Sequence, residues 1–169
     1  HEDIIQKHFL DSILLLNFMP KLESISMIDI GSGAGFPGIP LKIVCPDIHL
    51  TLLDSLHKRV DFLKIISNML EQDNVCLHGR AEQLAHNEEY REKFDSAVAR
   101  AVTNMPALLE YAMPFIKVGG TLLAMKGSRG GEELLSANKA TTVLGGSDLI
   151  RTDYALPNKD GRAIISVRK

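Results

Sequence analysis

The sequence has no tryptophan, and only 5% of its residues are aromatic. It has two cysteines, Cys45 and Cys76, which form no Cys-x-x-Cys motif, and no cysteine or histidine stands at zinc-ligand spacing. These absences exclude a disulfide framework and a zinc ribbon, so we expect no metal and a reducing, cytoplasmic setting. Both cysteines are expected to be buried, small apolar residues rather than nucleophiles.

Long hydrophobic runs and a charge excess are also missing. No apolar stretch reaches the roughly 18 residues of a membrane span, and no signal peptide is recognisable, so we expect no membrane partner. Lys and Arg total 19 against 21 Asp and Glu, and the net charge of −2 excludes a protein that coats DNA through bulk positive charge. Because the chain starts at His1 rather than Met, inside an expected helix, we expect N-terminal residues to be missing.

What is present is an alternation of strands and helices in a chain of 169 residues, a length that fits one domain. Apolar residues recur every three or four positions over residues 2–19, which predicts an amphipathic helix with Ile5, Phe9, Ile13 and Leu16 on its apolar face. The later strands are expected at 26–30, 49–54, 75–78, 94–99 and 121–125, and the later helices at 37–46, 56–71 (Val60, Leu63 and Leu70 inward), 106–118 and 131–144. This order predicts an α/β fold with a mostly parallel, doubly wound sheet.

The C-terminal part has a different pattern. Residues 148–155 and 163–167 flank a turn-forming segment, Pro157 to Gly161, which is a hairpin signal rather than another crossover. The hairpin is expected to add one antiparallel strand at the edge of the sheet.

The most informative segment is Asp29-Ile-Gly-Ser-Gly-Ala-Gly-Phe-Pro-Gly38, which lies where the first strand meets the next helix. Glycines there allow a sharp turn and close approach of a ligand to Gly31, Gly33 and Gly35. The helix N-terminus that follows favours a carboxylate or a phosphate. The segment is therefore expected to bind a cofactor, with a purely structural turn as the other interpretation.

Two cofactor classes fit this loop. Gly33, Gly35 and Gly38 match the dinucleotide fingerprint, and Asp54, at the end of the second strand, suits the ribose hydroxyls of either cofactor class. Asp29 favours S-adenosylmethionine, because a carboxylate in the cradle would repel a pyrophosphate but suit amino and sulfonium groups. A dinucleotide-dependent oxidoreductase remains the alternative.

Several motifs together resemble the bacterial small-subunit ribosomal RNA guanine-N7 methyltransferase family, also called glucose-inhibited division protein B. They are Lys7 to Ser12, Asp29 to Pro40, Asp54-Ser55 with Lys58-Arg59, Gly79 to Glu82, and Arg100 within Ala99 to Val102. The resemblance implies a class I, Rossmann-like methyltransferase that uses S-adenosylmethionine and methylates 16S ribosomal RNA or the small ribosomal subunit. Residues 1–20 would be the remnant of a longer helical segment, and 21–169 the donor-binding domain.

The resemblance assigns the donor pocket to Gly31, Phe36, Ala81, Glu82 and Arg100. From its place at the end of the fourth strand, Arg100 could instead pair with a structural carboxylate, and Glu82 could be a solvated acid. On the N-terminal helix, His8, Asp11 and Ser12 share one face, either as a polar packing patch or as part of an active-site lid. 

Lys126 and Arg129, after the fifth strand, could contact RNA phosphate or lie in a solvated loop. We expect a monomer. Guanine N7 has no proton to remove, so no general base is required, and the motif of amine-directed enzymes is absent after the fourth strand. A class I methyltransferase acting on another RNA or a small molecule, and an inactive RNA-binding domain, remain alternatives.

Overall fold

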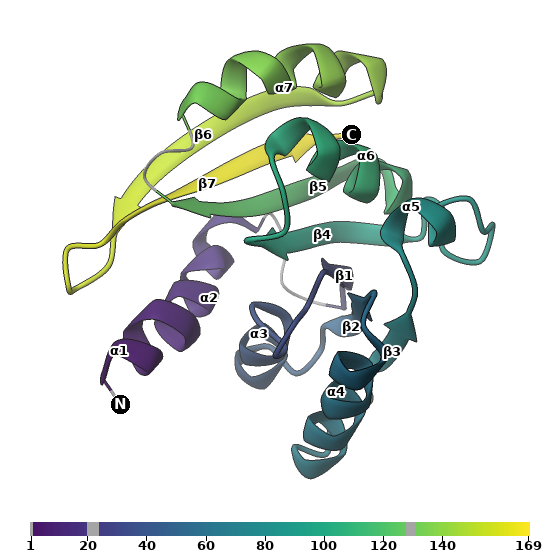
Figure 1. Ribbon diagram of the computed structural model, residues 1–169, viewed down its shortest axis with the longest axis vertical. Coiled ribbons are helices and arrows are strands. Elements are labelled where there is room, and N and C mark those ends of the chain that lie inside the picture. Colours follow the sequence, from purple (N-terminus) through teal and green to yellow (C-terminus); the bar gives the residue numbers. More distant parts are fainter. Residues whose placement is uncertain (1, 20–23, 128–130) are drawn as a thin grey trace.

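The computed structural model describes residues 2–19, 24–127 and 131–169. Its strands form one seven-stranded sheet in the order β3-β2-β1-β4-β5-β7-β6 (Figure 1). The strands are β1 (Ser26–Ile30), β2 (His49–Asp54), β3 (Val75–His78), β4 (Phe94–Arg100), β5 (Ile116–Gly127), β6 (Ser147–Ala155) and β7 (Gly161–Arg168). The first five strands pair in parallel, and β7 runs antiparallel to both of its neighbours. The α/β, mostly parallel architecture predicted from the sequence is confirmed.

The hairpin is confirmed, but its antiparallel strand is not at the edge of the sheet. β7 lies between β5 and β6, and β6 forms the edge. The two arms differ in burial, because Ala163, Ile164 and Ile165 of β7 are buried whereas no residue of β6 is. The more apolar arm therefore takes the interior position, where both of its edges are paired.

Helices cover both faces of the sheet. They are α3 (Gly38–Val44), α4 (His57–Met69), α5 (Ala81–Leu84), α6 (Met105–Ala112) and α7 (Gly131–Val143), with a 3-10 turn at Met113–Phe115. The N-terminal segment consists of α1 (Glu2–Ile4), a π-helical stretch (Ile5–Leu10), α2 (Asp11–Leu14) and a 3-10 turn (Leu15–Phe18). No described helix is both long enough and apolar enough to cross a membrane.

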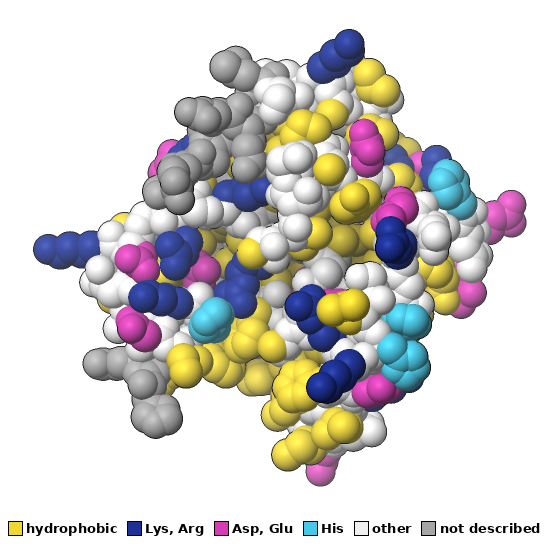
Figure 2. Space-filling model, in the orientation of Figure 1, with side chains coloured by type: hydrophobic (Ala, Val, Ile, Leu, Met, Phe, Trp, Pro, Cys, Tyr) yellow, Lys and Arg dark blue, Asp and Glu magenta, His cyan; other side chains and the backbone are white. Residues whose placement is uncertain are grey.

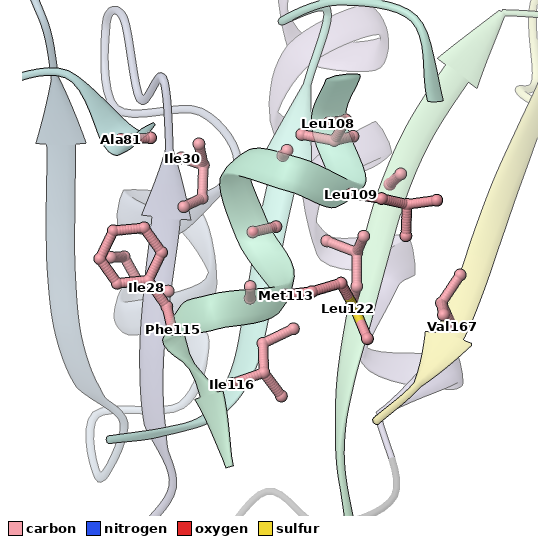
Figure 3. Packing of buried hydrophobic residues seen from close by; sticks show 14 of the residues in the cluster. Ile28, Ile30, Ala81, Leu108, Leu109, Met113, Phe115, Ile116, Leu122 and Val167 are labelled. Atoms are coloured by element: carbon pink, nitrogen blue, oxygen red, sulfur yellow. The ribbon is translucent and has the colours of Figure 1, made fainter. Parts of the chain in front are cut away.

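The core divides into two clusters on opposite faces of the sheet. Ile28 and Ile30 of β1 pack with Leu108, Met113 and Phe115 from α6 and the turn after it (Figure 3). On the other face, Met27 packs with residues of the N-terminal segment, α3 and α4, namely Leu15, Leu41 and Leu63. Because successive strand residues point to opposite faces, β1 contributes to both clusters and holds its C-terminal end between the two layers.

The N-terminal segment buries a different face from the one that its periodicity predicts. Ile5 and Phe9 are 57% and 40% exposed, whereas Asp11 and Ser12 are 3% and 0% exposed. The predicted inward position of Ile5 and Phe9 was therefore wrong, whereas Leu16 on the same predicted face packs against the core. A polar cluster described below helps to set the orientation of the segment.

Smaller differences follow from local chemistry. Leu70, expected to face inward, is 40% exposed, and both cysteines are only partly buried. The helix expected to extend to residue 118 ends at Ala112, where the following Pro114 has no N–H to continue it. β5 consequently starts at Ile116, earlier than predicted.

Candidate functional site

A cleft of about 330 Å³ opens at the carboxyl ends of the parallel strands. It is lined by Ile30, Gly31, Leu53, Asp54, Ser55, Arg59, Gly79, Arg80, Ala81, Glu82, Ala101, Val102 and Tyr111. These residues come from the carboxyl ends of β1, β2, β3 and β4, the segments just after them, and the helices α4, α5 and α6. Open α/β sheets bind their ligands at this edge, and we call this space the strand-end cleft.

The glycine loop after β1 borders the cleft through Gly31. Gly31, Gly33 and Gly35 all have positive φ angles, of 70°, 59° and 92°, which side chains rarely adopt. A Cβ atom added to Gly31 would lie 2.9 Å from Cγ2 of Val102, which also lines the cleft. The backbone of Gly31 is thus packed closely where a ligand would approach.

Asp54 joins the loop to the end of β2. Its carboxylate is 2% exposed, and its Oδ2 accepts the backbone N–H of Gly33 at 3.0 Å. Its Oδ1 accepts the N–H of Leu56 at 2.9 Å, and Arg59 Nη1 lies 3.4 Å from Oδ2. The structure therefore brings Asp54 and the glycine loop together at the cleft; its bond to a ribose stays a prediction.

Ala81 and Glu82 also line the cleft, from the first turn of α5. Ala81 is buried, and the Glu82 carboxylate lies 3.7 Å from Arg80 Nη1. Both side chains of this ion pair are largely exposed, so the pair is weak and free to rearrange around a ligand.

Asp29 lies beneath the loop and not in the cradle where the charge argument from the sequence placed it. It is 0% exposed, and its Oδ2 accepts the N–H of Gly38 at 2.9 Å. The other oxygen, Oδ1, has no hydrogen-bond partner among the described residues. Burial raises the pKa of Asp29 to about 7, and the Gly38 N–H only partly opposes this rise. A carboxyl group of that kind discriminates poorly between a sulfonium and a pyrophosphate.

Phe36 and Arg100, assigned to the donor pocket by the resemblance, are not among the residues that line the strand-end cleft. The Arg100 guanidinium lies 5.0 Å from the centre of the Phe36 ring, on the side of the N-terminal segment. The Phe36 ring also packs edge to face against the Phe9 ring, with 5.0 Å between the ring centres. The centre of the His8 ring lies 5.4 Å from that of Phe36. A direct contact of either residue with the donor stays a prediction.

Asp11 occupies the centre of a buried polar cluster with Arg100, Tyr154 and Arg162, which we call the Asp11 cluster. The Tyr154 hydroxyl donates to Asp11 Oδ1 at 2.6 Å. Arg162 Nε and Arg100 Nη1 lie 3.6 and 4.0 Å from Oδ2. Burial raises the pKa of Tyr154, and the bond to Asp11 adds to that rise, so the phenol stays a donor. Of the two interpretations for this helix face, the packing patch agrees with the contacts.

Lys126 and Arg129 are the remaining basic candidates, and the structure describes only the first of them. Lys126 Nζ donates to the carbonyl oxygen of Thr103, in the loop after β4. Arg129 lies outside the described residues. Lys126 is not among the described residues that line the cleft, and RNA contact by Lys126 or Arg129 stays a prediction.

Two features of the cleft were not assigned from the sequence. Tyr111 contributes an aromatic side chain from α6, and Arg59 lies on the first turns of α4 beside Asp54. Arg59 belongs to one of the motifs that carry the family resemblance, but no spacing signal identifies Tyr111. Within the described part of the chain, no group of three or more His, Cys, Asp or Glu residues could hold a metal ion.

The matching family model and the curated relatives agree on one family. The family model GidB, described as rRNA small subunit methyltransferase G, matches residues 1–156. A protein named ribosomal RNA small subunit methyltransferase G from Clostridium botulinum (strain Loch Maree / Type A3) is 52% identical over 155 residues, covering 90% of this chain and 65% of the relative. A protein of the same name from Oenococcus oeni is 49% identical over 170 residues, covering 99% of this chain and 70% of the relative.

The first of these curated relatives is thus matched over slightly less than two thirds of its length. Among solved structures, a SAM-dependent methyltransferase from Aquifex aeolicus superposes with a TM-score of 0.68 at 15% identity, covering 100% of this chain and 94% of that one. At this identity the likeness shows the fold alone, which is the Rossmann-like fold of class I methyltransferases.

Proposed function

The chain belongs to the rRNA small subunit methyltransferase G family, and from this membership we propose that it carries the methyl-transfer site of an enzyme acting on ribosomal RNA. The methyl donor is S-adenosylmethionine, and the acceptor is N7 of a guanine in 16S ribosomal RNA. The observation that carries the proposal is the family match over residues 1–156, which includes every residue of the strand-end cleft.

The residues of the cleft fit the donor. Its volume, about 330 Å³, is at the lower end of the range of small-molecule sites. The backbone of Gly31 reaches the cleft without a side chain, and Asp54 Oδ1 accepts one N–H, which leaves a lone pair for a ribose hydroxyl. We expect Gly31, Asp54, Ala81 and Glu82 to hold the nucleoside part of the donor, and Gly33 and Gly35 to shape the loop around its methionine part.

The cleft also suits an acceptor that needs no activation. When bound, the donor supplies an electrophilic methyl group on its sulfonium. Guanine N7 offers a lone pair and has no proton to lose, and neither cysteine nor histidine is found among the described residues that line the cleft. The protein would then contribute mainly orientation, which can lower a barrier by roughly 7 to 11 kcal/mol.

Positive charge near the cleft supports an RNA substrate. Figure 2 shows Lys and Arg side chains gathered around the hollowed centre of one face, although the net charge of the chain is −2. Local cations of this kind would contact phosphates and position the RNA without reading its sequence. We propose Lys126 and Arg129 among these contacts, and the cytoplasm, where ribosomes assemble, as the place of the reaction.

Donor binding is tested first, by titrating the chain with S-adenosylmethionine and, separately, with NAD in a calorimeter. We expect the methyl donor to bind and NAD not to bind. Binding of NAD alone would support the oxidoreductase alternative, and binding of ribosomal RNA without the methyl donor would support an inactive RNA-binding domain.

The reaction is tested with radiolabelled donor and small-subunit RNA from a strain that lacks this methylation. After digestion to nucleosides, the label is expected in 7-methylguanosine. Label in 5-methylcytidine or N6-methyladenosine would reject N7 chemistry, and label in another RNA but not in 16S RNA would reject the proposed substrate.

A further inference from the structure

We propose that Asp11 is a positioning residue of the donor site, which acts by holding Arg100 against Phe36 and so fixing the glycine loop from outside the cleft. Its consequence for donor binding rests on the proposed function. The contacts of Arg100 with Asp11 and Phe36 can be tested in the protein without any ligand.

The burial of Asp11 is the first observation. On the N-terminal segment the carboxylate of Asp11 is 3% exposed, while the apolar side chains of Ile5 and Phe9 are 57% and 40% exposed. Apolar packing holds the end of the segment, where Leu15 is fully buried, but it does not account for the burial of the Asp11 carboxylate. A carboxylate is withdrawn from water only where partners compensate its lost hydration, so specific polar contacts help to set how this segment sits on the sheet.

The partners of Asp11 come from distant parts of the chain. Tyr154 lies on β6 and Arg162 on β7, while Arg100 is the last residue of β4. The N-terminal helices lie beside the end of β6 and β7 where the two strands connect (Figure 1). Asp11 therefore joins three separate elements at the side of the sheet that carries the glycine loop.

Arg100 makes the connection to the loop. Among the described residues, Asp11 is the carboxylate within ion-pair distance of Arg100. The guanidinium also donates to the carbonyl oxygen of Lys7 at 3.2 Å and lies 3.0 Å from His8 Nδ1. The opposite contact is the Phe36 ring, 5.0 Å away, which is the geometry of a cation–π interaction. Arg100 is thus fixed on one side by the N-terminal segment and on the other by the loop.

Phe36 transmits this contact to the part of the loop that reaches the cleft. The backbone N–H of Phe36 donates to the carbonyl oxygen of Ser32 at 3.2 Å, and the N–H of Gly35 donates to the same oxygen at 2.8 Å. If the ring is held, these two hydrogen bonds are protected, and the glycines before them keep the positive φ angles described above. Loss of Asp11 should therefore loosen the loop although Asp11 does not line the cleft.

The test is hydrogen–deuterium exchange of the full chain without ligand, read at the amides of Gly35 and Phe36. Asp11→Asn keeps the size of the side chain and removes its charge, and we expect exchange at these amides to become at least ~10-fold faster. The matched control is Asp95→Asn, which removes a carboxylate bonded to Ser26 and Lys117 near the start of β4. This control should leave loop exchange unchanged.

Unchanged exchange in Asp11→Asn would overturn the proposal. So would equal acceleration in both variants, or an acceleration spread evenly over the sheet, since either result means a general loss of stability. If Asp11→Asn does not fold, Phe36→Leu breaks the same connection at its other end. It must then accelerate exchange at Gly35, or the proposal fails.

A double-mutant cycle on donor affinity tests whether Asp11 acts through Arg100. Donor affinity is measured by calorimetry for Asp11→Asn, Arg100→Lys and the double variant, because Arg100→Lys keeps the charge but loses the planar group that stacks on Phe36. We expect each single variant to bind S-adenosylmethionine about 10-fold more weakly, and the double variant no more than about 2-fold more weakly than Arg100→Lys. Additive losses would overturn a route through Arg100. A wild-type chain that binds no donor would instead defeat the proposed function, while the exchange experiment would still decide the role of Asp11.

Discussion

Asp54 accepts the backbone N–H of Gly33 at 3.0 Å, so the last residue of β2 holds the loop that follows β1. The same carboxylate faces the strand-end cleft. One side chain therefore serves both the shape of the loop and the expected ribose site.

Replacing Asp54 should weaken donor binding. Asp54→Ala removes an acceptor for a ribose hydroxyl and for the Gly33 N–H, and we expect a loss of about 1.5 to 3 kcal/mol in binding free energy, the range of hydrogen bonds to charged groups. Calorimetry with S-adenosylmethionine measures it. Asp61→Ala, which removes an exposed carboxylate from α4, is the control and should bind normally. Normal affinity in Asp54→Ala would remove this residue from the site.

Gly31 and Gly119 form a matched pair for testing the glycine loop. Both have positive φ, 70° and 86°, so an alanine at either position is strained. A Cβ at Gly31 would also meet Val102 at 2.9 Å, whereas a Cβ at Gly119 has nothing within 4 Å. We expect Gly31→Ala to bind the donor at least ~10-fold more weakly and Gly119→Ala to bind it normally. Equal affinities would mean that Gly31 is not part of the donor site.

Asp29 should make stability depend on pH. Burial raises its pKa from the ordinary value of 3.8 to about 7, so the folded protein binds more protons than the unfolded chain between these values. The stability from protonated Asp29 is fully present below about pH 4 and is lost as pH rises to about 7. Urea unfolding at pH 4.5, 6 and 8 should show this decline in the wild type and not in Asp29→Asn. Parallel pH profiles for the two proteins would contradict the raised pKa.

Asp95 should show the opposite dependence. Burial alone would raise its pKa, but hydrogen bonds from Lys117 and Ser26 outweigh that effect and lower the pKa to about 2. The stability that these bonds add is present above about pH 4 and is lost as pH falls toward 2. Because the Asp95 and Lys117 side chains are 41% and 45% exposed, we expect Asp95→Asn to cost about 1 kcal/mol or less at pH 7. A cost that persists at pH 2 would contradict this origin.

Local sequence patterns were sufficient for the order of elements and the position of the cleft. Short apolar strands such as Ser26–Ile30 and His49–Asp54 are recognised because each lies between turn residues, and their parallel arrangement follows from the helices between them. Gly31 and Asp54 follow from the same reasoning, since each ends a strand and the carboxyl ends of neighbouring parallel strands meet. Local geometry determines such positions, and neighbouring residues encode it.

Tertiary structure decided where the other side chains point. Asp29 stands in the same motif as Gly31, yet the alternation of β1 turns it under the loop toward Gly38. The orientation of the N-terminal segment depends on Tyr154 and Arg162, more than 140 residues away in the chain, and no periodicity over residues 2–19 contains that information. Arg100 is likewise directed away from the cleft, because its guanidinium contacts Lys7, His8 and Phe36, which are distant from it in the sequence. The sequence by itself determined the fold and the loop, whereas the burial of Asp11 arose only when distant polar groups converged and compensated the loss of water around its charge.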